Sequence, residues 1–146
     1  MNLKTIHNVY FIGIGGVGMS ALAKYFVALG KNVGGYDKVS SAITESLLEL
    51  GIDIQFETTV NQIDESFINP STTLVVFTPA ISKSNVIFQY FETHNFKILK
   101  RSEVLGLVTE LTQCLAVAGT HGKTTTSSIL GHLMYECNEK VTAFIG

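Results

Sequence analysis

Two glycine-rich segments of the sequence contain the residue types that bind phosphate groups. The first is Gly13-Ile14-Gly15-Gly16-Val17-Gly18, which matches the pattern G-x-G-x-x-G. The second is Gly119-Thr120-His121-Gly122-Lys123-Thr124-Thr125. Glycines let main-chain N–H groups approach an anion closely, and the start of a helix adds unpaired N–H groups and a partial positive charge. The two segments therefore predict two separate sites for polyphosphates.

The first loop has the sequence context that nucleotide binding through this pattern requires. An apolar strand is predicted before it, and apolar residues at helical spacing follow from Val17 until Gly30. Asp37 ends the next predicted strand, about 20 residues beyond the loop, where an acidic residue can accept a hydrogen bond from a ribose hydroxyl or a base. A glycine turn needed only for helix packing is the alternative, and the order of strand, loop, helix and acid favours binding. The loop does not determine which ligand binds, because NAD, FAD and a UDP-sugar all contain a pyrophosphate.

The second loop has the chemistry of a shortened P-loop. Lys123 would reach the β- and γ-phosphates of a nucleotide, and Thr124 would bind Mg²⁺. The strict pattern G-x-x-x-x-G-K-[ST] fails, because Val117 stands at its first glycine. A simple helix cap is the alternative, but a lysine in the first turn opposes the helix dipole unless an anion lies between them. His121 would contact a phosphate or adenine, or have a purely structural role.

The elements that must position these loops alternate between short apolar runs and amphipathic stretches, which is typical of a parallel sheet with helices on both faces. The predicted strands are 8–14, 32–36, 53–56, 73–78 and 96–99. The predicted helices are 17–29, 41–50, 85–94 and 101–112. The pattern then restarts with strand 114–118, loop 119–122, helix 123–137 and strand 141–145.

The fold class predicted is therefore α/β: a Rossmann-like parallel sheet flanked by helices, followed by the truncated start of a P-loop ATPase domain. The domain boundaries are 1–105 and 106–146. The second segment is too short to bury a core of normal size alone, so a truncated chain is expected.

Composition narrows the classes of protein. Hydrophobic residues make up 46% of the 146 residues and charged residues 15%, as expected for a covered sheet. The net charge of -2, without a basic stripe, argues against nucleic acid as a partner. Neither a signal peptide nor a membrane span fits, so we expect a cytoplasmic protein without a membrane partner. Cys114 and Cys137 are expected to be reduced, buried thiols.

Several motifs of the sequence resemble those of the Mur ligase family of peptidoglycan synthesis. Residues 11–20, FIGIGGVGMS, resemble the opening signature of the members that join L-alanine to UDP-N-acetylmuramate. Residues 117–126, VAGTHGKTTT, resemble the ATP loop of the same members. Thr78-Pro79-Ala80-Ile81 and 100–105 also fit the family pattern, so the resemblance spans the chain. One departure is Asn85-Val86-Ile87, where family members often have Asn-Pro-Glu, and no site is placed there.

The resemblance implies a role for each matching residue. The diphosphate of UDP-N-acetylmuramate would be held by Gly15, Gly16, Val17, Gly18, Met19 and Ser20. Asp37 would face the uridine, and the same crevice would be bordered by Thr78, Pro79 and Ala80. ATP would be bound by Gly119, Thr120, His121, Gly122, Lys123, Thr124 and Thr125. Within this loop Lys123 would stabilise charge on the γ-phosphate, and Thr124 would hold Mg²⁺.

The reaction that the resemblance implies is ATP-dependent amide formation. The γ-phosphoryl group passes to the muramoyl carboxylate, and the amine of L-alanine attacks the acyl phosphate. Catalysis of the first step would depend on positioning and charge neutralisation. The remaining family machinery would lie beyond Gly146, so the chain alone is expected to be inactive.

Three other kinds of function stay possible from the sequence: a related ligase, a protein that needs only the first loop, and a non-enzymatic binding module. The murein-peptide recycling ligase shares the Gly-Thr-His-Gly-Lys-Thr loop, although its first loop usually lacks the double glycine of Gly15-Gly16. An NAD-dependent Rossmann oxidoreductase or a nucleotide-sensing module would need only the first loop, and the Lys123-Thr124 pair argues against both. A non-enzymatic binding module would describe the chain itself, even within a larger enzyme.

Overall fold

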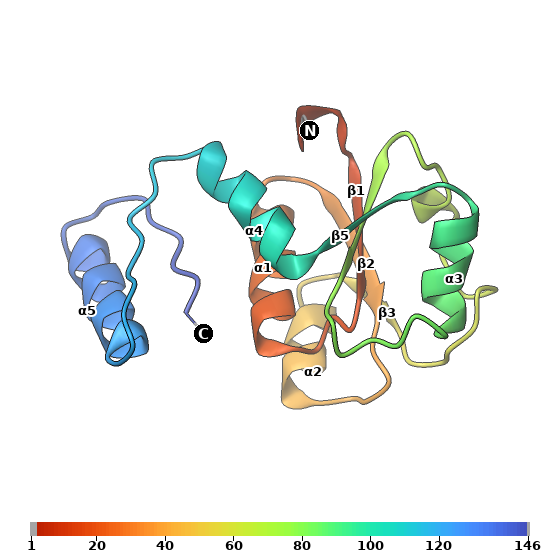
Figure 1. Ribbon diagram of the computed structural model, residues 1–146, viewed down its shortest axis with the longest axis horizontal. Coiled ribbons are helices and arrows are strands. Elements are labelled where there is room, and N and C mark those ends of the chain that lie inside the picture. Colours follow the sequence, from red (N-terminus) through yellow and green to blue (C-terminus); the bar gives the residue numbers. More distant parts are fainter. Residues whose placement is uncertain (1–2, 146) are drawn as a thin grey trace.

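The computed structural model describes residues 3–145 and has a five-stranded, fully parallel sheet of order β3-β2-β1-β4-β5 (Figure 1). The strands are β1 (Asn8–Ile12), β2 (Asn32–Tyr36), β3 (Asp53–Gln55), β4 (Thr73–Phe77) and β5 (Lys97–Lys100). The α-helices are α1 (Val17–Ala28), α2 (Ala42–Leu48), α3 (Val86–Thr93), α4 (Arg101–Glu110) and α5 (Lys123–Glu136). Two short 3-10 helices are η1 (Leu3–Thr5) and η2 (Glu65–Phe67). The strand order confirms the predicted Rossmann-like class.

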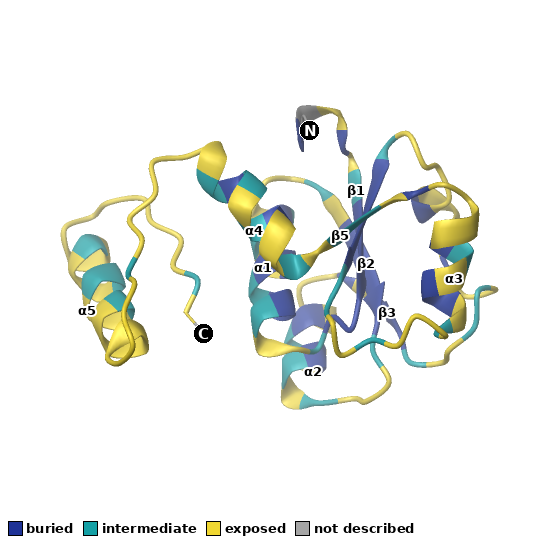
Figure 2. Ribbon diagram, in the orientation of Figure 1, coloured by how far each residue is buried: buried dark blue, intermediate teal, exposed yellow. Residues whose placement is uncertain are grey.

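Helices cover both faces of the sheet, and the alternation of side chains along each strand supplies two cores. On β1, Val9 and Phe11 pack into the core under α1, α2 and α4, whereas Tyr10 and Ile12 pack into the core under α3 and η2. All four side chains are almost fully buried. In Figure 2 the central strands β1 and β2 are accordingly buried along most of their length, whereas the edge strand β5 is only partly buried. Apolar runs without alternation are what a strand buried on both faces requires.

Short-range hydrogen bonds set the ends of several helices. Ser41 caps α2 reciprocally: its hydroxyl accepts from the N–H of Thr44, and its N–H donates to the Thr44 hydroxyl at 2.8 Å. Asn85 caps α3 through Oδ1, which accepts from two main-chain N–H groups. Gly30 and Gly51 follow α1 and α2 with φ of 72° and 79°, the left-handed conformation that ends helices. Asn85, which agrees with the first residue of the family pattern Asn-Pro-Glu, therefore has a structural use as a helix cap.

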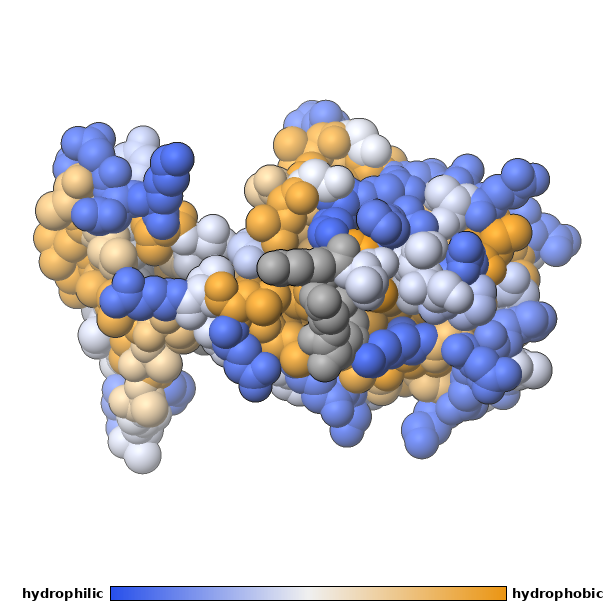
Figure 3. All heavy atoms as spheres, turned by 90° about the horizontal axis from the view of Figure 1, so that it is seen from above, coloured by the Kyte–Doolittle hydropathy of each residue, from blue (hydrophilic) through white to orange (hydrophobic). Residues whose placement is uncertain are grey.

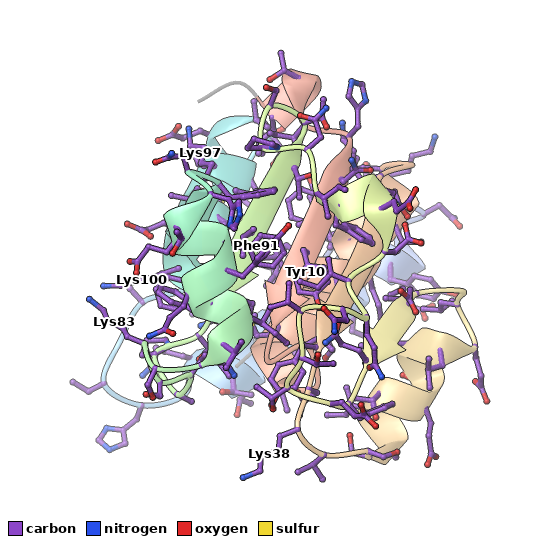
Figure 4. The ribbon with its side chains drawn as sticks, turned by 90° about the vertical axis from the view of Figure 1, so that its right-hand side faces the viewer. Tyr10, Lys38, Lys83, Phe91, Lys97 and Lys100 are labelled. Carbon is purple, nitrogen blue, oxygen red and sulfur yellow. The ribbon has the colours of Figure 1, made fainter. Side chains whose placement is uncertain are left out.

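The core under α3 contains the buried phenol of Tyr10. Its hydroxyl donates to Oε1 of Gln55 at 3.0 Å, and the Gln55 amide donates to two main-chain carbonyls. Burial raises the pKa of Tyr10 well above its ordinary value, with smaller contributions from Asp53 and Tyr36. Figure 4 shows Tyr10 and Phe91 together under α3, and their ring centroids are 5.1 Å apart.

The predicted strands 114–118 and 141–145 are wrong, because neither segment has strand structure. Parallel strands need a hydrogen-bonded neighbour, and within residues 3–145 no strand runs beside either segment. The predicted helix is present as α5, yet none of its described side chains is buried. The expectation of buried thiols is also wrong, because Cys114 and Cys137 are both exposed.

The segment around α5 has apolar side chains without a core of its own. Ile129 and Leu133 are 56% and 55% exposed, and Figure 3 shows hydrophobic side chains at the surface of this smaller part of the molecule. The segment touches the larger part through Phe144, whose ring packs edge to face on Tyr25 with centroids 5.7 Å apart. The apolar face of α5 has the composition of a helix that packs on a sheet.

Candidate nucleotide-binding site

The candidate site begins where the five strands of the described sheet end in one row, and four of them lead into it. The residues paired in that row, in the order β2, β1, β4 and β5, are Tyr36, Ile12, Phe77 and Lys100. The next residue along each strand enters the site, in the same order: Asp37, Gly13, Thr78 and Arg101. The chain leaves β1 towards β2 and returns on the other side as β4, so this edge is the switch point at which open α/β sheets bind ligands.

Hydrogen bonds and close packing fix the first loop between β1 and α1. The N–H groups of Gly13 and Ile14 donate to the carbonyl of Tyr36 at 2.7 and 3.1 Å. Gly13 has φ of 88°, and a Cβ there would stand 3.2 Å from Thr78 Cγ2 and 3.3 Å from Ile81 Cδ1. The turn after β4 therefore packs directly on the glycine loop.

The start of α1 presents three main-chain donors. Among the described residues, the N–H groups of Val17, Gly18 and Met19 donate no hydrogen bond, and the first bond of the helix is Ser20 N to Gly16 O at 2.8 Å. Gly16 and Val17 are exposed and Gly18 is partly exposed, so solvent or a ligand reaches this end of α1. Unpaired donors with the positive end of the helix dipole form a site for an anion.

Met19 and Ser20 contribute differently from the residues before them. The side chain of Met19 is 2% exposed and packs in the core under α1. The Ser20 hydroxyl is buried and donates to the carbonyl of Val17 at 2.9 Å. Any contact of Met19 with an anion would therefore come from its main chain. On the opposite side of the crevice, Thr78 is partly exposed and Pro79 and Ala80 are exposed.

Asp37 holds the loop rather than projecting freely into the crevice. Its Oδ2 accepts from the N–H of Gly15 at 2.7 Å, and its Oδ1 accepts from the N–H of Val39 at 3.1 Å. A Cβ on Gly15 would stand 2.8 Å from the same Oδ2. Gly15 is therefore a glycine because the Asp37 carboxylate occupies the space of its side chain.

Arg101 is a member of the site that sequence reasoning missed. The sequence places it only within residues 100–105, which fit the family pattern, but in the structure its guanidinium lies against Gly18, since a Cβ on Gly18 would stand 2.8 Å from Nη1. The two residues are far apart in the sequence, and only the register of β1, β4 and β5 brings them to one edge. The direct passage from β5 into α4 was the one signal available.

An open hollow of about 700 Å³ lies beside the turn after β4, on the α3 side. Its lining combines aromatic rings with charged side chains: Phe77, Pro79, Ile81, Lys83, Phe88, Glu92, Asn95, Phe96, Ile98, Lys100 and Glu103. Figure 4 shows Lys83 and Lys100 on the same side of α3, directed outwards. Since Pro79 and Ile81 line the hollow and Ile81 also packs on Gly13, the hollow is next to the glycine loop.

The second loop leads directly into the start of α5. Gly122 precedes the helix in the left-handed conformation, with φ of 76°. The ammonium of Lys123 lies back over the loop and donates to the carbonyls of Gly119 at 2.7 Å and Thr120 at 3.3 Å. The first turn of α5 contains no acidic residue, and residues 119–126 are exposed. These residues fit ATP, whose phosphates would take the Lys123 ammonium from the two carbonyls.

Within residues 3–145, no group of three or more His, Cys, Asp or Glu side chains could hold a metal ion. Over the same range, no helix has the length and apolar character needed to cross a bilayer.

The strand order, the switch point and the glycine loop at the start of α1 define a doubly wound α/β protein of the nucleotide-binding type. The model of the Mur ligase family, catalytic domain, matches residues 8–112, more than half of the chain. The chain belongs to the Mur ligase family.

Individual relatives agree with this assignment. Over all 146 residues the chain is 58% identical to the UDP-N-acetylmuramate--L-alanine ligase of Flavobacterium psychrophilum and 56% identical to that of Flavobacterium johnsoniae. It covers 32% of each, so the chain spans about a third of the length of these curated relatives.

Solved structures extend the comparison. The Thermotoga maritima UDP-N-acetylmuramate-alanine ligase aligns with a TM-score of 0.77 and 29% identity, covering 90% of this chain and 30% of that one. The Neisseria meningitides UDP-N-acetylmuramate:L-alanyl-gamma-D-glutamyl-meso-diaminopimelate ligase aligns with the same TM-score and 25% identity, covering 96% of this chain and 47% of that one.

Proposed function

We propose that this chain is the UDP-sugar-binding part of an ATP-dependent ligase that joins L-alanine to UDP-N-acetylmuramate in peptidoglycan synthesis, within the cytoplasm. The observation that carries the proposal is the set of three open N–H groups at residues 17–19, placed at the switch point of the sheet. Identity of 58% and 56% to two ligases of that name, along the entire chain, supports the same reading.

The first loop and its neighbours would bind the UDP-sugar. The diphosphate oxygens would accept from the main chain of residues 15–20, with the donors of Val17, Gly18 and Met19 contributing most. Asp37 would hold the loop in its binding shape and reach the uridine with its remaining lone pairs. The turn Thr78-Pro79-Ala80 would form the opposite wall, because it packs on Gly13.

The second loop would bind ATP with Mg²⁺ through residues 119–125. ATP supplies the phosphoryl group, and Mg²⁺ held by Thr124 would neutralise its charge. Lys123 would leave the carbonyls of Gly119 and Thr120 and contact the γ-phosphate as its charge develops. The muramoyl carboxylate oxygen then forms a bond to phosphorus as the bond to ADP breaks, and the L-alanine amine displaces phosphate from the acyl group.

The two loops would belong to two domains, 1–105 and 106–146 with its continuation. The exposed apolar side chains of α5 and the unpaired segments 114–118 and 141–145 support this division. A sheet completed by further strands would give both segments hydrogen-bond partners and would cover Ile129 and Leu133.

The murein-peptide ligases are the second candidate, since one of them has the same fold with a TM-score of 0.77. Identity favours the alanine ligases, at 58% against 25%. The two readings differ in the acceptor, which is an amino acid in one case and a peptide in the other.

Thermal unfolding of the 146-residue chain with UDP-N-acetylmuramate, NAD and Mg-ATP in parallel tests the proposal. A ligand that binds only the folded state stabilises it by about 2.7 kcal/mol at a hundredfold excess over Kd. We expect stabilisation by UDP-N-acetylmuramate and none by NAD. Stabilisation by NAD with none by the UDP-sugar would contradict the proposed ligase function and favour a Rossmann oxidoreductase.

A further inference from the structure

The guanidinium of Arg101 occupies the place where a side chain on Gly18 would stand. A Cβ on Gly18 would lie 2.8 Å from Nη1, 3.1 Å from Cζ and 3.2 Å from Cδ of Arg101. The whole end of the arginine therefore lies along the first turn of α1, beside the open N–H groups of residues 17–19. Glycine at position 18 is what allows this approach.

The backbone around Arg101 is fixed firmly enough to aim the side chain. β5 passes into α4 without a loop, and the N–H of Lys100 donates to Oε2 of Glu103 at 2.7 Å, which closes the first turn. Val104 and Val108 are buried against the sheet and α1 and hold α4 in place. Arg101 is the first residue of this anchored helix, and its side chain is partly exposed.

The charge of Arg101 is uncompensated where it lies. Among residues 3–145 its guanidinium makes no ion pair or hydrogen bond, and the first turn of α1 contains no acidic residue. The carboxylate of Asp37, after β2, already accepts from Gly15 and Val39, and that of Glu103 in the first turn of α4 accepts from the N–H of Lys100. A cation beside the positive end of a helix is unfavourable, and an anion that lies between the two makes the arrangement favourable.

We propose that Arg101 is a diphosphate-binding residue of this site, which rests on the proposed function of the first loop. Its guanidinium pairs with oxygens of the nucleoside diphosphate, while the N–H groups of Val17, Gly18 and Met19 donate to the others. A planar guanidinium matches two phosphate oxygens at once, which an ammonium cannot do. The interaction recognises the phosphates and not the uracil base.

Calorimetric titration with UDP-N-acetylmuramate, UDP and uridine tests the assignment in Arg101→Ala and in Lys97→Ala as the matched control. Lys97 lies at the opposite end of β5, paired with Leu74, so both variants remove one positive charge and only one removes it from the site. We expect Arg101→Ala to raise the Kd for UDP-N-acetylmuramate and for UDP by about 10- to 100-fold, as for a lost hydrogen bond to a charged group. Uridine should bind Arg101→Ala and the wild type equally, and Lys97→Ala should match the wild type for all three.

Arg101→Lys keeps the stem and the charge, and covers the case in which Arg101→Ala does not fold. It should still lose severalfold in UDP affinity, because the two-point contact is gone. Equal UDP affinity of the wild type and either folded Arg101 variant would overturn the assignment and leave the proposed function standing. Failure of the wild type to bind UDP or UDP-N-acetylmuramate would instead reject the proposed function itself.

Discussion

The main-chain N–H of Gly15 donates to Oδ2 of Asp37 at 2.7 Å, which ties the glycine loop after β1 to the end of β2. The same carboxylate accepts from Val39 through Oδ1, so both of its oxygens hold main chain. Asp37 therefore shapes the loop from the neighbouring strand, in addition to any contact with a uridine. Three open donors remain beyond the point where the carboxylate holds the loop.

Replacing Gly15 with alanine tests this arrangement. The new Cβ would stand 2.8 Å from Asp37 Oδ2 and 3.0 Å from Thr44 Cγ2, so the carboxylate must move and the loop must shift. We expect a loss of stability of about 1–3 kcal/mol and a loss of UDP-N-acetylmuramate affinity of at least about tenfold. Chemical denaturation and calorimetry measure the two effects, and unchanged affinity in the folded variant would show that the Gly15–Asp37 bond is irrelevant to binding.

Two other glycines differ sharply in what surrounds them, and this difference predicts opposite effects of alanine. A Cβ on Gly35 would stand 2.5 Å from the carbonyl oxygen of Phe11, where main chain of β1 cannot yield. Gly106 has open space around it inside α4, where alanine is the better helix former by about 1 kcal/mol. Urea denaturation should give a marked loss of stability for Gly35→Ala and a gain of about 0.5–1 kcal/mol for Gly106→Ala. A stable Gly35→Ala would contradict the register of β1 and β2.

The parallel sheet could be predicted from the sequence because its signals are local. The apolar run from Leu74 to Phe77 and the helix-ending glycines Gly30 and Gly51 each lie within one short window of the chain. The predicted strands 114–118 and 141–145 are wrong because a strand also depends on a partner elsewhere in the chain. An apolar run predicts a strand, but only a neighbouring strand supplies its hydrogen bonds. The candidate site could be predicted only in part for the same reason, since no pattern in the sequence indicates that Arg101 contacts Gly18.

Alkaline unfolding should report the buried phenol of Tyr10. Burial raises its pKa above the ordinary value of about 10, so the folded protein keeps the phenol proton where the unfolded chain loses it. This contribution to stability is complete below about pH 10 and is lost as pH rises further. The free energy of unfolding of Tyr10→Phe should therefore fall less steeply above about pH 10 than that of the wild type.

Tyr10→Phe also removes the hydrogen bond to Gln55, which sets a second expectation at neutral pH. Leaving Gln55 Oε1 without this donor should cost about 1–3 kcal/mol. Parallel alkaline slopes for the two proteins would mean that the phenol is not the group that titrates.

The 146-residue chain should release no ADP in response to L-alanine. The chain covers 32% of the ligases it matches, and the second loop lies in a segment without a buried core. A coupled assay with UDP-N-acetylmuramate, Mg-ATP and L-alanine measures the rate. Substantial L-alanine-dependent ADP release by this chain would contradict the division into two domains.

The central claim is that the open start of α1 binds the diphosphate of a UDP-sugar, and Gly16 offers the most direct test. Gly16 is the N-cap of α1 with extended φ and ψ, and a Cβ there would make only ordinary contacts, the nearest at 3.6 Å. Gly16→Asp and Gly16→Asn are therefore a matched pair that can both cap the helix and fold, and they differ only in one negative charge at the site.

The measurement is the affinity of both variants for UDP-N-acetylmuramate by calorimetry, with thermal unfolding as the check of fold. We predict that Gly16→Asp is at least as stable as the wild type yet loses about 100-fold or more in affinity relative to Gly16→Asn, because only its carboxylate repels the phosphates. Equal affinities of the two folded variants would contradict the claim, because a negative charge at the N-terminus of α1 would then have no effect on ligand binding.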